Sequence, residues 1–353
     1  MTKILSLATV DPPHRFSTNE IAEAADKYWL QGQTDMRLRS AALKILHSAE
    51  ISERFSVVNL ETVFSELSFE ERNNLYIDAV KKMAEQVLLR ACAQADISPR
   101  SLDYLITTSC TGFMIPSVDA YLVDKLGLRQ DVIRMPITEM GCAGGSSGLI
   151  YADRILRSDA KARAAVIAVE APSLTFQRND FSMENLVSTA IFADGAACAI
   201  LGQGPGAGPK ILDSSMYHFP NSTHLMGYRL TNSGLKIVLD REVPAAIMEH
   251  FDRYFLPLLE RHHLGINDVA HFVFHPGGKK IVQSVEKILH PLGKNVDASR
   301  AVLRARGNLS SATVFYVLEE VMRTGRPAPG DNGYLLAFGP GFSAQSVLLQ
   351  WEN

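Results

Sequence analysis

Two short stretches of small residues correspond to one another: Gly141-Cys142-Ala143-Gly144-Gly145-Ser146 in the first half of the chain and Gly307-Asn308-Leu309-Ser310-Ser311-Ala312 in the second. Each is a turn that opens a helical pattern. Apolar runs precede them at matching places, residues 102–107 and 269–274, and small residues close each half at 194–201 and 339–343. This common order indicates a duplicated unit, with chance matching of apolar strands as the alternative.

The apolar runs are typical of buried strands, and the stretches between them have helical periodicity, which predicts α/β layers. One helix is expected after the capping box Ser17-Thr18-Asn19-Glu20, and another over residues 73–95. The Gly- and Pro-rich segment 202–209 is the best linker candidate. We therefore divide the chain into an N-terminal half, residues 1–205, and a C-terminal half, residues 206–353.

The composition excludes several classes of function. The chain has 353 residues, 46% of them hydrophobic, and Lys plus Arg total 35 against 38 Asp plus Glu. Since no block of like charge occurs, nothing favours a nucleic-acid or polybasic membrane surface. The N-terminus lacks a signal-peptide core, no apolar run approaches the roughly 18 residues of a membrane span, and four scattered cysteines suit a reducing compartment. We expect a soluble, cytoplasmic protein.

Cys142 is the candidate nucleophile. A cysteine at the first turn of a helix lies near free N–H groups and the positive end of the helix dipole, which lower the pKa of a thiol. Flanking glycines permit a sharp turn and a close approach of substrate. The alternative is a buried structural cysteine beside packing glycines.

A thiol of this kind needs a base, and a tetrahedral or enolate oxygen needs hydrogen-bond donors. His275 directly follows an apolar strand, so its imidazole can accept the proton of Cys142. Asn308 begins the helix that mirrors that of Cys142, and its amide can donate to a thioester carbonyl or an enolate. The simpler interpretation of Asn308 is a cap of its own helix.

At this point the residues resemble the type III polyketide synthases, the chalcone-synthase-like branch of the condensing enzymes with a thiolase fold. The resemblance spans nearly the whole chain. It rests on six motifs in order, namely 11–14 (DPPH), 141–145 (GCAGG), 192–197 (FADGAA), 275–278 (HPGG), 307–312 (GNLSSA) and 338–341 (FGPG). It implies a thiolase-like duplicated αβαβα layered fold.

The resemblance implies that Cys142 carries the starter acyl group from an acyl-CoA. His275 and Asn308 would promote decarboxylation of malonyl-CoA and stabilise the enolate that attacks the thioester. No metal or redox cofactor is implied, because coenzyme A thioesters are the only substrates. Family members are homodimers in which the loop at 114–116 crosses to the partner's cavity.

Further substrate contacts are implied by the same resemblance. Phe192 matches a gatekeeping phenylalanine, Ile237 replaces a second one, and Cys110 stands where plant members have threonine, which favours a bacterial-type enzyme. Tyr228, or Gly227 with a register slip of one, takes the place of a small cavity residue. The predicted substrate-binding residues are Cys110, Ile115, Thr175, Phe192, Tyr228, Ile237, Ser310, Gly339 and Pro340. Contacts to coenzyme A are predicted at Lys44, Arg54, Gly277 and Lys279, with Lys280 as the second member of a lysine pair, although exposed lysines usually only face solvent.

Three alternatives share the predicted fold. A β-ketoacyl synthase III-like enzyme shares the Cys-His-Asn set but performs one condensation, and it usually has Gln-Ala-Asn after its histidine where this chain has Pro276-Gly277-Gly278. A thiolase would need a second cysteine near the C-terminal closer, and the chain has no cysteine after Cys198. A non-catalytic acyl-binding homologue would keep the fold without the chemistry. The loss of the aromatic side chain at Ile237 favours a medium- or long-chain aliphatic starter, cyclised to a pyrone or resorcinol-type product.

Overall fold

The computed structural model describes residues 1–206 and 208–352; Ala207, in the predicted linker, and Asn353 lie outside them. The strands are β1 (Lys3–Val10), β2 (His14–Ser17), β3 (Glu53–Ser56), β4 (Tyr104–Thr108), β5 (Ile133–Ile137), β6 (Ala164–Glu170), β7 (Gly195–Gly202), β8 (Lys210–His218), β9 (Met226–Thr231), β10 (Gly234–Leu239), β11 (Val269–Phe274), β12 (Asn332–Gly339) and β13 (Ser343–Gln350). The α-helices are α1 (Thr18–Ala25), α2 (Met36–Ser48), α3 (Leu60–Phe64), α4 (Phe69–Gln94), α5 (Val118–Lys125), α6 (Gly144–Leu156), α7 (Met183–Ile191), α8 (Val243–Glu249), α9 (Phe251–Tyr254), α10 (Leu256–Glu260), α11 (Lys279–Leu289), α12 (Asp297–Arg306) and α13 (Thr313–Glu320).

The strands repeat one arrangement in the two halves of the chain. Within the described residues, one mixed sheet has the order β11-β12-β13-β8-β1-β7-β6-β4-β5. β4 runs parallel to β6, which is antiparallel to β7, which is antiparallel to β1; β11, β12, β13 and β8 repeat this pattern in turn. The two halves meet where Lys3 of β1 pairs with Lys210 of β8. The arrangement matches the order of elements predicted from the sequence.

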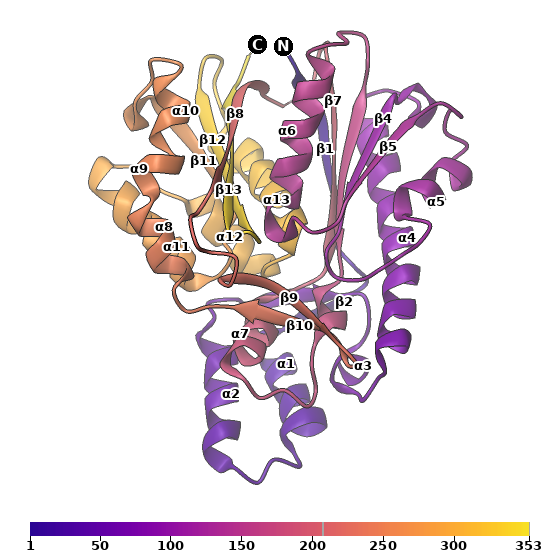
Figure 1. Ribbon diagram of the computed structural model, residues 1–353, viewed down its shortest axis with the longest axis vertical. Coiled ribbons are helices and arrows are strands. Elements are labelled where there is room, and N and C mark those ends of the chain that lie inside the picture. The colour runs from indigo at the N-terminus through magenta and orange to yellow at the C-terminus, as the bar shows by residue number, and fades with distance from the viewer. Residues whose placement is uncertain (207, 353) are drawn as a thin grey trace.

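The helices form layers around this sheet (Figure 1). α6 and α13 pack against each other and lie between the strands of the two halves. α4 covers the other face of β1, β6 and β7, while α9 and α10 cover β8 and β13. α4 buries Tyr76, Val80, Met83, Val87 and Ala91 against those strands, which is the face predicted from the periodicity. The result is the expected αβαβα sequence of layers.

A smaller group of elements lies at one end of the sheet, below it in Figure 1. It contains α1, α2, α3 and α7, the pair β2–β3 and the separate hairpin β9–β10. The predicted capping box is present at the start of α1, where Ser17 and Glu20 bond reciprocally. This group covers the turns that carry the candidate residues of the site.

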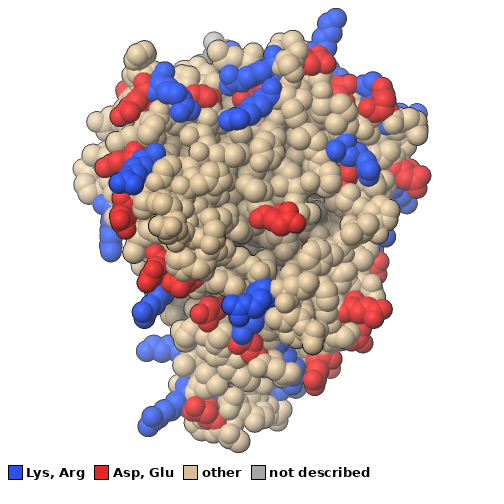
Figure 2. Space-filling view, in the orientation of Figure 1, with Lys and Arg blue, Asp and Glu red and all other residues tan. Residues whose placement is uncertain are grey.

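The surface has no dominant charge on the face seen in Figure 2. Acidic and basic side chains are interspersed around its edge, and the centre is largely uncharged. In the part of the chain that the structure describes, no helix combines the length and apolarity needed to cross a membrane.

Candidate active site

Cys142 lies in a 3-10 turn, Gly141–Ala143, that leads directly into α6. Gly141 has φ +51°, and a Cβ atom there would lie 2.5 Å from Cδ of Pro340. Glycine is therefore required both by the backbone conformation and by the close approach of the β12–β13 turn. Cys142 is 8% exposed, and this residual surface faces a cavity.

Asn308 is held by both its backbone and its side chain. Its backbone N–H donates to the carbonyl of Ile191 at 2.8 Å, and its carbonyl accepts from the N–H of Ala193 at 2.9 Å, so the segment that carries Phe192 is fixed beside it. Its Nδ2 donates to the carbonyl of Gly277 at 2.8 Å, and its Oδ1 accepts from the N–H of Ser310 at 2.9 Å. Asn308 thus caps the next turn, and its amide also forms a hydrogen bond with the thiol of Cys142.

His275 directly follows β11, and its backbone N–H donates to the carbonyl of Leu336 at 2.8 Å. The side chain is buried, and neither ring nitrogen has a hydrogen-bond partner among residues 1–206 and 208–352. Burial lowers the pKa of this imidazole to about 3. His275 is therefore a neutral base at physiological pH.

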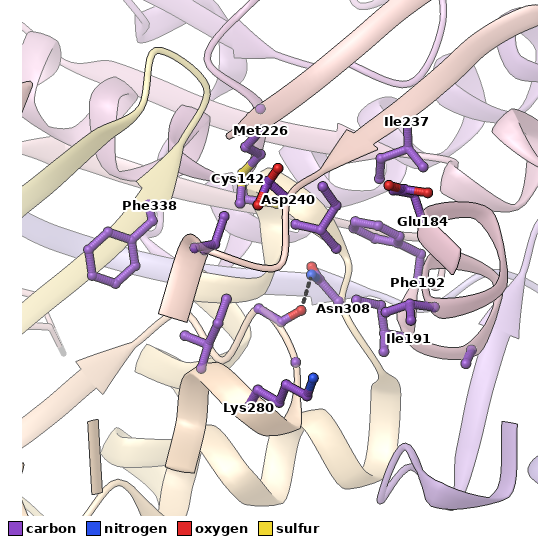
Figure 3. Close-up of a pocket in the computed structure, with 18 of the residues that line it drawn as sticks. Cys142, Glu184, Ile191, Phe192, Met226, Ile237, Asp240, Lys280, Asn308 and Phe338 are labelled. Atoms are coloured by element: carbon purple, nitrogen blue, oxygen red, sulfur yellow. Dashed lines mark hydrogen bonds between the residues drawn. The ribbon is translucent and has the colours of Figure 1, made fainter. Parts of the chain in front are cut away.

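One cavity of about 690 Å³ brings these three residues together. Its inner end contains the buried Cys142, His275, Asn308 and Ser310, while Glu184, Arg241 and Lys280 are exposed at its mouth. Figure 3 shows Phe192 and Ile237 near Glu184 and Phe338 farther along the wall. The wall between mouth and inner end is mainly apolar, formed by Ile45, Ala49, Val187, Ala190, Ile191, Phe192, Met226, Ile237, Leu239, Val243, Ile281 and Phe338.

The thiol of Cys142 does not have the low pKa that its place at a helix start predicted. Burial raises the pKa to about 12, and hydrogen bonds with the side chains of Ser310 and Asn308 offset this only in part. The prediction of a lowered pKa is wrong because the sequence reveals a helix start but not the loss of water around the sulfur. In this state Cys142 and His275 are both neutral.

A buried network backs the inner end of the cavity. Sγ of Cys110 lies 3.3 Å from Oγ of Ser310, which in turn lies 3.7 Å from Sγ of Cys142. On its other side Cys110 meets the buried Glu170, which accepts from the hydroxyl of Thr111 at 2.7 Å and from the N–H of Cys110 at 3.1 Å. Burial raises the pKa of Glu170 and that of the Cys110 thiol. Glu170 was not predicted, although it ends the apolar run 164–169.

Some of the other predicted substrate contacts line the cavity and some do not. The cavity that contains Cys142, His275 and Asn308 is also lined by Cys110, Phe192, Tyr228, Ile237, Ser310 and Pro340. Thr175 instead lines a smaller cavity of about 70 Å³ that lies behind Phe192. Gly339 packs under the Cys142 turn, since a Cβ there would lie 2.4 Å from the carbonyl oxygen of Met140. Ile115 is 98% exposed and is not part of the wall of the cavity in its own chain.

The predicted contacts to coenzyme A also divide. Gly277 and Lys279 line the cavity, and Lys279 pairs with Glu50 at 2.7 Å. Lys44 is exposed outside the wall. Arg54 is 4% exposed and donates to the carbonyl of Thr189 at 2.6 Å, so it is not on a surface that a phosphate reaches.

Two further cations lie at the mouth, Arg241 and Lys280, and the sequence predicted only Lys280. Arg241 and Lys280 line the cavity and form no ion pair within the described ranges. Lys280 was predicted as a phosphate contact together with Lys279, whereas Arg241 was missed because it lies in a short connection with no motif. Arg241 and Lys280 lie at the same cavity mouth only because, in the folded chain, this connection approaches the start of α11.

Comparison with known proteins agrees with this geometry. Residues 18–205 match the model of the N-terminal domain of chalcone and stilbene synthases, and residues 211–351 match that of the C-terminal domain. The chain belongs to the chalcone and stilbene synthase family, the type III polyketide synthases. The resemblance inferred from the six motifs is confirmed. The protein is accordingly an acyltransferase of the condensing type.

Bacterial enzymes are among the relatives of this polyketide synthase. It is 35% identical to 1,3,6,8-tetrahydroxynaphthalene synthase of Streptomyces peucetius subsp. caesius, with 99% of this chain and 93% of the relative covered. It is 28% identical to phloroglucinol synthase of Pseudomonas fluorescens, with 96% of each covered. The crystal structure of 1,3,6,8-tetrahydroxynaphthalene synthase from Streptomyces coelicolor superposes with a TM-score of 0.93 at 28% identity and covers 100% of both chains. The predicted thiolase-like α/β fold is confirmed.

Proposed function

We propose that this polyketide synthase extends a medium- or long-chain aliphatic acyl-CoA by repeated decarboxylative condensation with malonyl-CoA, and cyclises the chain to a pyrone or resorcinol-type product. The observation that carries the proposal is the convergence of Cys142, His275 and Asn308 at the inner end of a cavity whose wall is mainly aliphatic. Apolar walls favour an alkyl chain because its burial removes apolar surface from water.

Loading begins from a neutral thiol and a neutral imidazole. His275 accepts the proton of Cys142 as the sulfur attacks the thioester carbonyl, and this proton then passes to the sulfur of the departing coenzyme A. Because the pKa of Cys142 is raised and that of His275 is lowered, proton transfer and attack are coupled. The acyl group remains on Sγ of Cys142.

Condensation then uses the donors around the inner end. Malonyl-CoA loses carbon dioxide, and the electron pair of the broken bond forms the enolate of acetyl-CoA. The N–H of Asn308 that is not bonded to Gly277, and a protonated nitrogen of His275, stabilise the enolate oxygen. The enolate carbon attacks the thioester on Cys142, the thiolate leaves, and the product is a β-ketoacyl-CoA longer by one two-carbon unit. Reloading on Cys142 repeats the cycle, and coenzyme A thioesters are the only substrates required.

The experiment measures release of labelled carbon dioxide from malonyl-CoA and the products formed from acyl-CoA starters ranging from acetyl to stearoyl. We expect turnover with aliphatic starters and a loss of about a hundredfold or more in condensation by Cys142→Ala. Lys44→Ala is the control, since Lys44 lies outside the cavity wall. Absence of decarboxylation with every starter would contradict the proposal.

Analysis of the products in the same experiment also distinguishes two alternative functions. A β-ketoacyl synthase III-like enzyme adds a single two-carbon unit, so the mass of its product reveals it. The names of the relatives favour a second candidate: tetrahydroxynaphthalene and phloroglucinol are polyhydroxylated rings without an alkyl chain. If malonyl-CoA alone gives the fastest product formation, this second candidate replaces the aliphatic starter.

We further propose that the enzyme acts in the cytoplasm as a homodimer. All four cysteines are free thiols, which suits a reducing compartment. The exposed loop at 113–116 supports the dimer, because the neighbouring apolar side chains of Phe113 and Ile115 gain by being covered together.

A further inference from the structure

The hairpin β9–β10 forms one wall of the cavity but is separate from the main sheet. Met226 and Tyr228 of β9, and Ile237 and Leu239 of β10, line the cavity. The two strands pair only with each other among the described strands. The position of this wall therefore depends on side-chain contacts beyond the hairpin.

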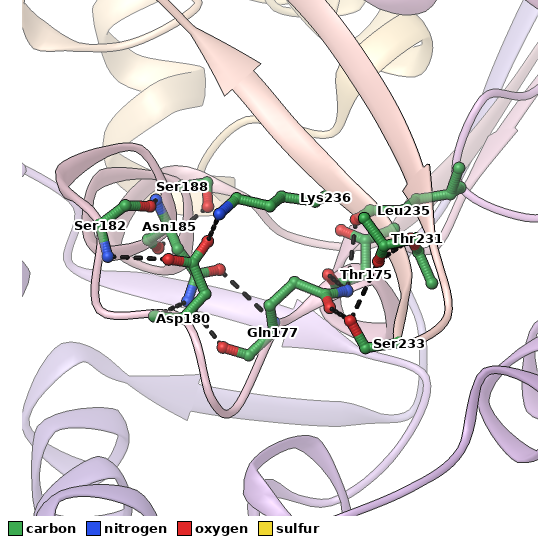
Figure 4. Close-up of polar contacts among 11 residues, drawn as sticks. Thr175, Gln177, Asp180, Ser182, Asn185, Ser188, Thr231, Ser233, Leu235 and Lys236 are labelled. Carbon is green, nitrogen blue, oxygen red and sulfur yellow. Dashed lines mark hydrogen bonds and ion pairs between the residues drawn. The ribbon is translucent and has the colours of Figure 1, made fainter.

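Gln177 provides the first of these contacts (Figure 4). Its side chain is 5% exposed, and its Oε1 accepts from the hydroxyl of Ser233 at 2.7 Å. Its Nε2 donates to the carbonyl of Thr175 at 3.0 Å and to the carbonyl of Leu235 at 3.4 Å. One buried amide thus joins the tip of the hairpin to the segment that precedes α7.

An ion pair provides the second contact. Nζ of Lys236, on β10, lies 3.0 Å from Oδ2 of Asp180, and the two side chains are 37% and 15% exposed. Lys236 is adjacent in sequence to Ile237, the residue that replaces a gatekeeping phenylalanine. Alternation along a strand places the two side chains on opposite faces, so Lys236 is anchored while Ile237 lines the cavity.

Asn185 connects this segment to α7. Its Nδ2 donates to the carbonyl of Gln177 at 2.8 Å and to the carbonyl of Asp180 at 2.6 Å. α7 ends at Ile191, immediately before Phe192. The polar clasp, defined as Gln177, Asp180, Asn185, Ser233 and Lys236, therefore links the strand that carries Ile237 to the helix that leads to Phe192.

We propose that the polar clasp is a determinant of acyl-chain length, because it fixes the distance between the two cavity walls that carry Phe192 and Ile237. This inference rests on the proposed function. The ion pair is partly exposed, and such pairs contribute little to global stability. Loss of the clasp on the hairpin side is therefore expected to loosen one wall of the cavity without unfolding the protein.

The test uses the double variant Ser233→Ala/Lys236→Met, which removes the two links made by side chains of the hairpin and leaves Gln177, with its hydrogen bond to the carbonyl of Leu235, and Asp180 in place. The measured quantity is the ratio of kcat/KM for a long acyl-CoA starter to that for a short one. We expect this ratio to rise about fivefold, which corresponds to the loss of a weak ion pair and a hydrogen bond. The single variant Lys236→Arg keeps both the positive charge and native Ser233. It should therefore have the same ratio as the wild type.

Arg323→Met is the matched control, because Arg323 forms an exposed ion pair with Glu320 outside the cavity wall. It should leave the ratio unchanged. Malonyl-CoA decarboxylation by the wild-type enzyme distinguishes failure of the proposed function from failure of this inference. If the wild type does not decarboxylate malonyl-CoA, the proposed function is wrong. If decarboxylation is present but the double variant has the wild-type ratio and products, the clasp does not set chain length and the inference is overturned.

Discussion

Cys142 is the proposed nucleophile, yet its sulfur is buried. A nucleophilic thiol reacts as the thiolate, whereas burial disfavours the thiolate. The thiol of Cys142 has a pKa raised to about 12 by burial, so the thiolate fraction near pH 7 is small. His275, which lines the same cavity, stays uncharged because burial lowers its pKa to about 3. Resting Cys142 therefore lacks the cationic partner that would hold it as a thiolate.

The prediction concerns alkylation of Cys142 by iodoacetamide. Because only the thiolate reacts, and because a raised pKa places its formation at high pH, the rate should rise steadily from pH 6 to pH 10. The rate is measured by mass spectrometry, with Cys142→Ser reporting reaction at the other cysteines. A rate that levels off below pH 7 would indicate an ion pair with His275 and would contradict the prediction.

At the scale of single turns and helices, glycine decides where Asn308 lies. Gly307 has φ +75°, and a Cβ atom there would lie 2.9 Å from the carbonyl oxygen of Ile191, the same oxygen that accepts from the N–H of Asn308. A side chain at this position would therefore push apart the segments that carry Asn308 and Phe192.

We predict that Gly307→Ala lowers the free energy of unfolding by about 1 to 3 kcal/mol and reduces malonyl-CoA decarboxylation. Gly330→Ala is the matched control, because Gly330 has φ +91° but open space where its Cβ would lie. Denaturant unfolding should show a loss of stability in both variants. The prediction fails if Gly307→Ala retains the decarboxylation rate of Gly330→Ala.

The mouth of the cavity gives a second prediction at this scale. Arg241 precedes α8 and Lys280 lies in the first turn of α11, and both are exposed beside the cavity. A phosphate of coenzyme A bound there would gain charge-assisted hydrogen bonds. Arg241→Ala/Lys280→Ala should raise KM for acyl-CoA about tenfold with kcat nearly unchanged, in steady-state kinetics. Lys44→Ala is the control, and an equal effect of Lys44→Ala would exclude this location.

These elements indicate what a single sequence can and cannot reveal. The helix expected over 73–95 is α4, Phe69–Gln94, and its earlier start follows from the capping box of Ser68 and Glu71, a signal present in the sequence. Cys142 and Asn308 were found because each stands in a turn of small residues. Arg241 was not found, because no local sequence pattern indicates that a hairpin and a helix come together around it. The pKa of Cys142 depends on burial by both halves, which no local pattern records.

For the whole molecule, the loop at 113–116 is an apolar feature fixed in place yet exposed. Phe113 exchanges two backbone hydrogen bonds of 2.8 Å with the side chain of Asn73 on α4, so the loop is anchored. Phe113 remains 46% exposed and Ile115 98% exposed. An anchored loop cannot fold its apolar side chains inward, so a second copy of the chain is the surface expected to cover them.

We therefore predict that the protein sediments as a dimer and that Ile115→Asp weakens this dimer, because association would bury a carboxylate without a partner. Analytical ultracentrifugation over a range of concentrations measures the change. Met36→Asp is the control, since Met36 is also exposed, at 65%, but lies at the start of α2. If Ile115 also reaches the partner's cavity, Ile115→Ala should alter the product distribution while the dimer persists. A wild-type monomer, or equal dissociation of the Ile115→Asp and Met36→Asp variants, would place the contact elsewhere.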